Sequence, residues 1–214
     1  MFFQMREHWA LQKVSSEYNK CLQKYGPSPQ GVHWRNTDSQ QRRFDLLLEI
    51  ILPQHRHGGV SLYDLGCGYG AFFRYIRNHA VMRQSTYIGY EINKLLLRTA
   101  KRSISDGRAK FVLSKKPTKF ADYGLISGTF NLKMSTDHIF WWRYVQATLT
   151  KCWQKTKHGM AFNLLDIKKS KSPHDKLFYC NPQQVLEFCQ NRLTQKALLK
   201  SHPNLPDAHF FLWR

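Results

Sequence analysis

Two acidic residues and a cluster of glycines have the types and spacing that could carry chemistry in this sequence. Asp64 and Leu65 end a buried apolar run and lead into Gly-Cys-Gly-Tyr-Gly at positions 66–70. Glycine lets a chain turn sharply and lie against a ligand with no side chain between them. Glu91 ends the next apolar run, where a carboxylate can accept hydrogen bonds from both hydroxyls of a ribose. The pattern therefore predicts a site for a ligand of the adenosine type.

The spacing of the glycines separates two classes of such ligands. Proteins that bind dinucleotides use Gly-x-Gly-x-x-Gly, and a helix N-terminus there receives the pyrophosphate. Here the spacing is Gly-x-Gly-x-Gly, and the charge of Asp64 would repel a pyrophosphate. S-adenosylmethionine (SAM) carries an ammonium and a sulfonium but no phosphate. The turn therefore favours SAM over a dinucleotide.

The segment before this turn has the apolar spacing of two helices. The first covers residues 1–25 and is stopped by Gly-Pro-Ser-Pro at 26–29. The second is expected to begin at a cap formed by Asp38 or Ser39 and to end at Pro53.

From residue 60 onward, apolar runs typical of strands alternate with segments of helical spacing. We expect strands at 60–65, 86–91, 110–114, 123–127, 159–165, 196–201 and 208–214, and helices at 71–79, 94–104, 137–155 and 182–193. The alternation implies a parallel sheet covered on both faces, while the short turn between the last two strands forces an antiparallel hairpin. The prediction is a three-layer α-β-α sandwich with a seven-stranded, mostly parallel sheet. It forms one domain, with a helical extension at 1–55 and a core at 56–214.

Residues 63–70 resemble the first motif of the class I SAM-dependent methyltransferases, and Glu91 matches the acid that binds ribose in that family. The strand pattern of 60–214 is similar to the family's sheet, and the chain looks like a small single-domain branch. The resemblance implies methyl transfer with SAM as cofactor. It implies contacts to SAM from the residues of the turn, the following strand end and the fourth strand end: Asp64, Gly66, Cys67, Gly68, Glu91, Ile92, Ser127 and Gly128.

The second helix adds two candidates. Gln40 and Arg43 resemble residues that help close the cofactor site in small members of the family, where Arg43 would bind the SAM carboxylate. They also fit the polar face of an ordinary amphipathic helix. One feature departs from the family, because no acid follows the third strand. Ser114 or a backbone carbonyl would then accept the hydrogen bond of the adenine amino group.

The acceptor of the methyl group is not evident from the sequence. The fourth strand end lacks the Pro-Pro turn of amino-methylating DNA enzymes and the Pro-Cys pair of cytosine-C5 enzymes. Asn131 can orient an acceptor and Lys133 can bind an anionic one, although both also suit an ordinary loop. The aromatic cluster Trp141, Trp142 and Tyr144 suits either a substrate wall or helix packing. The basic segment 166–179 lies where this fold shapes its acceptor pocket.

Charge and cysteine content limit the partners. Lys and Arg number 33 against 14 acids, a formal charge of +19 that attracts anions. A small, possibly anionic acceptor is the leading expectation. The alternatives are methylation of RNA, or a SAM-binding or nucleic-acid-binding module without catalysis.

Five cysteines without Cys-x-x-Cys spacing predict neither disulfides nor a metal site. No apolar run is long enough to span a membrane, and a cytoplasmic protein is expected.

Overall fold

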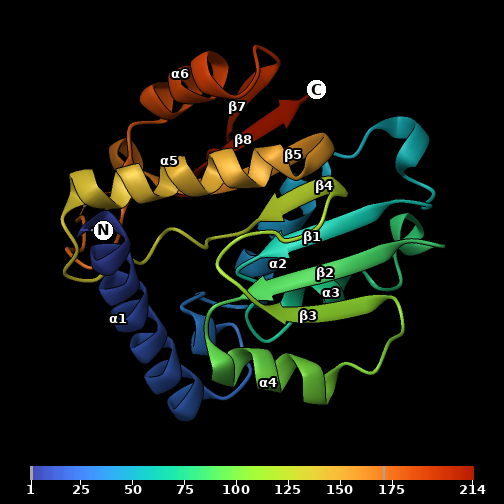
Figure 1. Cartoon of the computed structure of the whole chain (residues 1–214), viewed down its shortest axis with the longest axis horizontal. Helices are drawn as coiled ribbons and strands as arrows, with labels where there is room; N and C mark the ends of the chain where they lie inside the picture. Colours follow the sequence, from blue (N-terminus) through green and yellow to red (C-terminus); the bar gives the residue numbers. More distant parts are fainter. Residues whose placement is uncertain (1, 171) are drawn as a thin grey trace.

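A mixed β-sheet forms the centre of the fold, which is described here from a computed structural model for residues 2–170 and 172–214. The strand order is β3-β2-β1-β4-β5-β8-β7, and the short β6 pairs with β5 outside this order. The strands are β1 (Ser61–Leu65), β2 (Thr86–Glu91), β3 (Ala109–Leu113), β4 (Ala121–Ile126), β5 (Thr156–Asp166), β6 (Tyr179–Cys180), β7 (Ala197–Ser201) and β8 (Asp207–Trp213). Figure 1 shows β1 to β4 side by side with their carboxyl ends at one edge.

Strand direction confirms the expected sheet. Strands β1 to β5 run parallel to one another, whereas β8 is antiparallel to β5 and to β7. The last two strands form the expected hairpin, in which Ala197 pairs with Leu212 and Ser201 with Ala208. Because β8 enters the sheet between β5 and β7, all but the last of its residues are buried.

Helices cover both faces of the sheet and confirm the three-layer α-β-α architecture (Figure 1). One apolar core joins the sheet to α2, α3 and α4, and a second joins it to α5 and α6. The buried residues of α5 recur at helical spacing, for example Trp141, Tyr144, Val145 and Thr148. The helices are α1 (Phe2–Tyr25), α2 (Thr37–Leu48), α3 (Ala71–Ile76), α4 (Lys94–Ser103), α5 (His138–Gln154) and α6 (Pro182–Arg192), with short 3-10 turns η1 (Gln30–Val32), η2 (Pro53–His55), η3 (Ala80–Met82) and η4 (Ile167–Lys169).

Three local expectations were wrong. Asn36 caps α2 instead of Asp38 or Ser39, since its side chain accepts the Ser39 N–H at 2.8 Å. Helix α2 ends at Leu48, well before Pro53, and α3 ends at Ile76, because in both places the chain tightens into turns that lead to η2 and η3. Strand β6 was not expected, because two residues are too few to show an alternating pattern.

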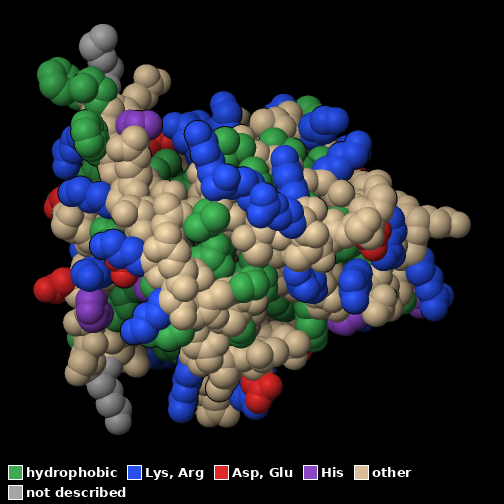
Figure 2. Space-filling view, turned by 90° about the horizontal axis from the view of Figure 1, so that it is seen from below, with side chains coloured by type: hydrophobic (Ala, Val, Ile, Leu, Met, Phe, Trp, Pro, Cys, Tyr) green, Lys and Arg blue, Asp and Glu red, His purple; other side chains and the backbone are tan. Residues whose placement is uncertain are grey.

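Folding buries more acids than bases. Arg43 is the only buried Lys or Arg within residues 2–170 and 172–214. On the face shown in Figure 2, Lys and Arg side chains are spread widely and clearly exceed Asp and Glu. The buried acids are Glu7, Asp64, Glu91, Asp166 and Asp207. The folded surface is therefore more basic than the composition alone indicates.

In the part of the chain that the structure describes, none of the helices combines the length and the apolarity needed to cross a bilayer.

Candidate active site

A cavity of about 410 Å³ lies at the carboxyl ends of β1, β2 and β4. Helix α1 crosses this edge of the sheet (Figure 1) and lines the cavity together with residues 32–35. Open α/β sheets bind their ligands at this edge, and ligand pockets commonly measure about 300–1,000 Å³. Of the predicted residues, those that line the cavity are Gln40, Arg43, Asp64, Gly66, Cys67, Gly68, Glu91, Ile92, Ser127, Gly128 and Asn131.

The glycine turn joins β1 to α3 through left-handed backbone conformations. Gly66, Gly68 and Gly70 have φ angles of 77°, 56° and 85°. A Cβ atom on Gly66 would lie 2.4 Å from the Thr129 Oγ1, and one on Gly70 would lie 2.4 Å from the Ile104 Cδ1. Glycine is therefore required at these two positions by backbone angle and by space.

The N–H groups of this turn are already used inside the protein. Those of Gly66 and Cys67 donate to the Tyr90 carbonyl at 2.7 and 3.1 Å, and that of Gly68 donates to Glu91 Oε2 at 2.9 Å. A pyrophosphate site needs such N–H groups to point at the ligand. This turn therefore suits a ligand that carries positive charge better than one that carries phosphates.

Asp64 and Glu91 place two buried carboxyl groups beside the turn. Burial raises the pKa of Asp64 to about 7, although a hydrogen bond from the Tyr87 hydroxyl at 2.6 Å opposes the shift. Burial also raises the pKa of Glu91, against hydrogen bonds from the N–H groups of Asn93 and Gly68. Buried carboxylates gain stability from a nearby positive charge, so a cationic ligand would favour their ionised forms.

Asn93 attaches α1 to the sheet. Its side-chain oxygen caps the first turn of α4, while its Nδ2 donates to the Ser15 carbonyl and to Asn19 Oδ1, both at 2.8 Å. An ion pair of 2.8 Å between Lys115 and Glu7 provides a second attachment. These contacts hold Val14 and Tyr18 of α1 against the cavity.

Arg43 projects from α2 and is paired with Asp207 on β8. The Arg43 Nε donates to Asp207 Oδ2 at 2.6 Å, and the guanidinium lies 4.7 Å from the centre of the Trp34 ring. Asn163 Nδ2 donates to Asp207 Oδ1 at 3.0 Å, and Asn163 Oδ1 accepts the Gly128 N–H at 2.9 Å. A buried polar network therefore connects α2, β8 and β5 to the loop that follows β4, and Arg43 has its charge balanced within the protein.

The loop after β4 brings two buried polar atoms to the cavity. Ser127 Oγ and Asn131 Oδ1 have no hydrogen-bond partner among the described residues. Between them, Gly128 has a φ of 66°, and the Trp34 ring packs so closely that a Cβ atom would lie 2.6 Å from it. Buried polar atoms normally have partners, so a polar ligand would complete this part of the site.

Comparison with known proteins agrees with this geometry. A family model described as a methyltransferase domain matches residues 63–162. A protein of Mycobacterium tuberculosis, named provisionally as a methyltransferase, is 29% identical over 65% of this chain and 84% of its own length. The chain is therefore similar to class I methyltransferases, and its match to the family model is limited to residues 63–162.

Solved structures of methyltransferases share the fold of this chain at low sequence identity. A SAM-dependent methyltransferase from Leishmania major superposes with a TM-score of 0.61 at 16% identity, covering 91% of this chain and 81% of its own. The magnesium protoporphyrin IX methyltransferase from Synechocystis, solved with bound S-adenosylhomocysteine, gives a TM-score of 0.60 at 10% identity, covering 83% and 84%.

Two candidates for the acceptor side of the site lie away from the cavity wall. Lys133 does not line the cavity, because its Nζ turns back to donate to the Thr136 carbonyl at 3.2 Å. Trp142 packs on Phe178 and Phe188, whereas Trp141 and Tyr144 do reach the cavity wall. In the basic segment 166–179, Lys169 is bound to the backbone before β8, Leu177 lines the cavity, and Lys171 lies outside the described residues.

The N-terminal extension contributes a wall of the cavity that the sequence could not assign. Leu11, Val14, Tyr18, His33 and Trp34 all line the cavity. The apolar spacing of residues 1–25 indicated a helix with one buried face but could not indicate what that face covers.

Proposed function

We propose that this methyltransferase binds SAM in the cavity and transfers its methyl group to a small acceptor that carries negative charge. The observation that carries the proposal is the pair of buried carboxyl groups, Asp64 and Glu91, at a glycine turn whose N–H groups are occupied. Together they favour a cationic nucleoside.

The cavity residues suggest how SAM would be held. Glu91 would accept hydrogen bonds from the ribose hydroxyls, and Ile92 would make apolar contact with the adenine. Asp64 and the backbone of Gly66, Cys67 and Gly68 attract the ammonium group. We assign Gln40 and Arg43 to the carboxylate end and Ser127 with Gly128 to the sulfonium. When bound, SAM supplies a methyl carbon open to attack by a nucleophile.

The nature of the acceptor is inferred from the side chains of the same wall. Ser127 and Asn131 are neutral, so they can orient an acceptor but not remove its proton at neutral pH. An acceptor atom that is already anionic, such as a carboxylate oxygen, needs no base. Arg35 lines the cavity and would attract such a molecule. The covering helix α1 limits its size.

The first test measures cofactor binding by thermal shift. At about 100 times its dissociation constant, SAM should stabilise the chain by about 2.7 kcal/mol, a rise in Tm of roughly 5–11 °C. Glu91→Ala should remove most of this rise because the ribose loses its acceptor. Glu187→Ala, the same change on the exposed face of α6, should keep it. A rise with NAD but not with SAM would contradict the proposal.

The acceptor is tested by transfer of a labelled methyl group. The chain is incubated with methyl-labelled SAM and either a panel of small carboxylates and phenolates or total RNA. Label in a small anionic product supports the assignment, whereas label in RNA alone overturns it.

A further inference from the structure

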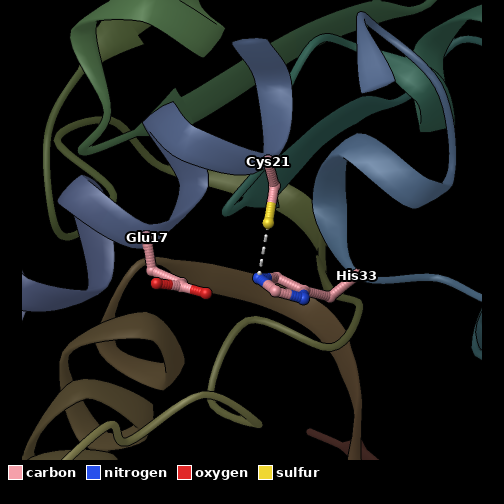
Figure 3. Close-up of side chains that lie close together, drawn as sticks. All are labelled: Glu17, Cys21 and His33. Atoms are coloured by element: carbon pink, nitrogen blue, oxygen red, sulfur yellow. Dashed lines mark hydrogen bonds between the residues drawn. The ribbon is translucent and has the colours of Figure 1, made fainter. Parts of the chain in front are cut away.

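Three side chains with metal-binding atoms meet beside the cavity (Figure 3). Glu17 and Cys21 are one helical turn apart on α1, so they share one face of that helix. His33 follows η1 and points its ring back toward Cys21. One ligand atom from each of the three residues lies within 4.8 Å of the others.

The spacing of these atoms is close to that of a metal site. The distance between Cys21 Sγ and His33 Nε2 is 3.3 Å. Zinc bonds of about 2.3 Å to sulfur and about 2.0 Å to nitrogen, at a tetrahedral angle, place the two ligands roughly 3.5 Å apart. A hydrogen bond also explains the 3.3 Å distance, but it does not explain the carboxylate of Glu17. That carboxylate turns toward the same point and makes neither a hydrogen bond nor an ion pair within the described residues.

The conformation of His33 is fixed by the chain itself. Its φ of 63° is one of three positive values at non-glycine positions in residues 2–170 and 172–214. Such a conformation costs of order 1–3 kcal/mol, and here it ends the η1 turn and sets the direction of the His33 side chain. The His33 N–H donates to the Gln30 carbonyl at 3.1 Å, and its ring packs edge-on against Tyr18 at 5.4 Å. The imidazole is thus aimed at Cys21 before any ligand binds.

The protonation states allow metal binding at neutral pH. Burial lowers the pKa of His33, so the ring is neutral and has a lone pair available. Burial and the charge of Glu17 raise the pKa of Cys21, which keeps its proton in the absence of a metal. A divalent ion displaces that proton, so binding releases one proton to solvent.

We propose that Glu17, Cys21 and His33 bind a zinc-type divalent ion that fastens η1 to α1. Sulfur, imidazole nitrogen and carboxylate oxygen together suit zinc, whereas magnesium and calcium prefer oxygen alone. Three protein ligands leave one position for water. Because Tyr18, His33 and Trp34 line the cavity, the ion would stiffen its wall and strengthen SAM binding. The cysteine spacing predicted no metal site. It could not indicate this one, because two of the ligands are one helical turn apart and the third follows in a later turn.

The test uses the untagged full chain, stripped of metal and titrated with cobalt(II), which replaces zinc and absorbs light. The wild type should bind one ion per chain and develop a thiolate-to-cobalt charge-transfer band. Cys21→Ser should lose the band, and Glu17→Gln and His33→Asn should each weaken binding at least about tenfold. His57→Asn, a change at an exposed histidine on another loop, should change nothing. The other four cysteines are buried, so the band reports Cys21.

Two results would overturn the metal site. One is equal cobalt affinity in the wild type and in Cys21→Ser, provided that circular dichroism shows both folded. The other is binding without a thiolate band. The outcome is independent of the proposed function, because cobalt binding needs no SAM. Metal binding without SAM binding would refute the methyltransferase proposal and leave the metal site intact. If both hold, zinc should lower the dissociation constant of SAM in the wild type but not in Cys21→Ser.

Discussion

At Asp64, burial favours the protonated carboxyl group, whereas the charge of a cationic ligand favours the ionised form. Burial holds the pKa of its carboxyl group at about 7, above its ordinary value of 3.8. The folded chain without ligand therefore keeps a proton that the unfolded chain releases. Because the unfolded state binds fewer protons in this range, the free energy of unfolding should fall as pH rises from about 4 to 7.

The same pKa predicts how SAM affinity depends on pH. Only ionised Asp64 attracts the ammonium group, so affinity should rise by about an order of magnitude between pH 6 and pH 8. Asp64→Asn should flatten that rise when dissociation constants are measured by calorimetry. The ammonium itself titrates near pH 7.7–8.0, but it does so equally in both proteins. An unchanged pH profile in Asp64→Asn would assign the dependence to another group.

At the scale of elements, Asn93 makes two kinds of contact whose contributions to stability can be measured separately. It caps α4, and it also binds α1 through its Nδ2. Asn181 caps α6 in the same way, through the Gln183 N–H, and within residues 2–170 and 172–214 its side chain bonds to no other element. The two positions therefore form a matched pair.

Asn93→Ala should lower the free energy of unfolding by about 2–4 kcal/mol, since it removes a cap and buried hydrogen bonds. Asn181→Ala should cost only about 1 kcal/mol. Urea unfolding measures both values, and SAM binding should weaken in Asn93→Ala alone because α1 loosens. Equal costs in the two variants would show that the contact with α1 contributes nothing.

Elements were predictable from the sequence where their local pattern was strong. The strand at 86–91 was predicted to the residue, and the glycine turn with Glu91 indicated the correct edge of the sheet. The cap of α2 was missed because Asn36, Asp38 and Ser39 are all chemically suitable, and only the backbone angles of Asn36 decide among them. The position of α1 over the cavity depends on Asn93, whose partners lie far away in the chain.

At the scale of the whole molecule, the Arg43–Asp207 pair joins parts of the chain that are 164 residues apart. Burial raises the pKa of Asp207 despite the neighbouring guanidinium, so the effect of leaving water outweighs the attraction to Arg43. No sequence pattern pairs these two residues, so Arg43 was predicted as a ligand for SAM without its partner. The hydrogen-bonded link through Asn163 to Gly128 also joins residues far apart in the chain, so it could not be predicted from the sequence either.

Removal of Asp207 should therefore be costly. Asp207→Ala leaves Arg43 buried without a counter-charge and should lower the free energy of unfolding by about 3–5 kcal/mol. The exposed pair of Glu49 and Lys200 joins the same regions, and Glu49→Ala should cost at most about 1 kcal/mol. Chemical denaturation compares the two. A cost for Asp207→Ala no larger than that for Glu49→Ala would mean that Arg43 finds water or another partner.

The burial of five acids has a practical consequence for experiments with this protein. A surface so rich in uncompensated lysine and arginine adsorbs polyanions of any sequence, and such adsorption weakens steeply as salt rises. Nucleic acid that co-purifies with the chain, or shifts with it on a gel at low salt, therefore does not by itself identify the acceptor. Only the atom that acquires the methyl group identifies the acceptor.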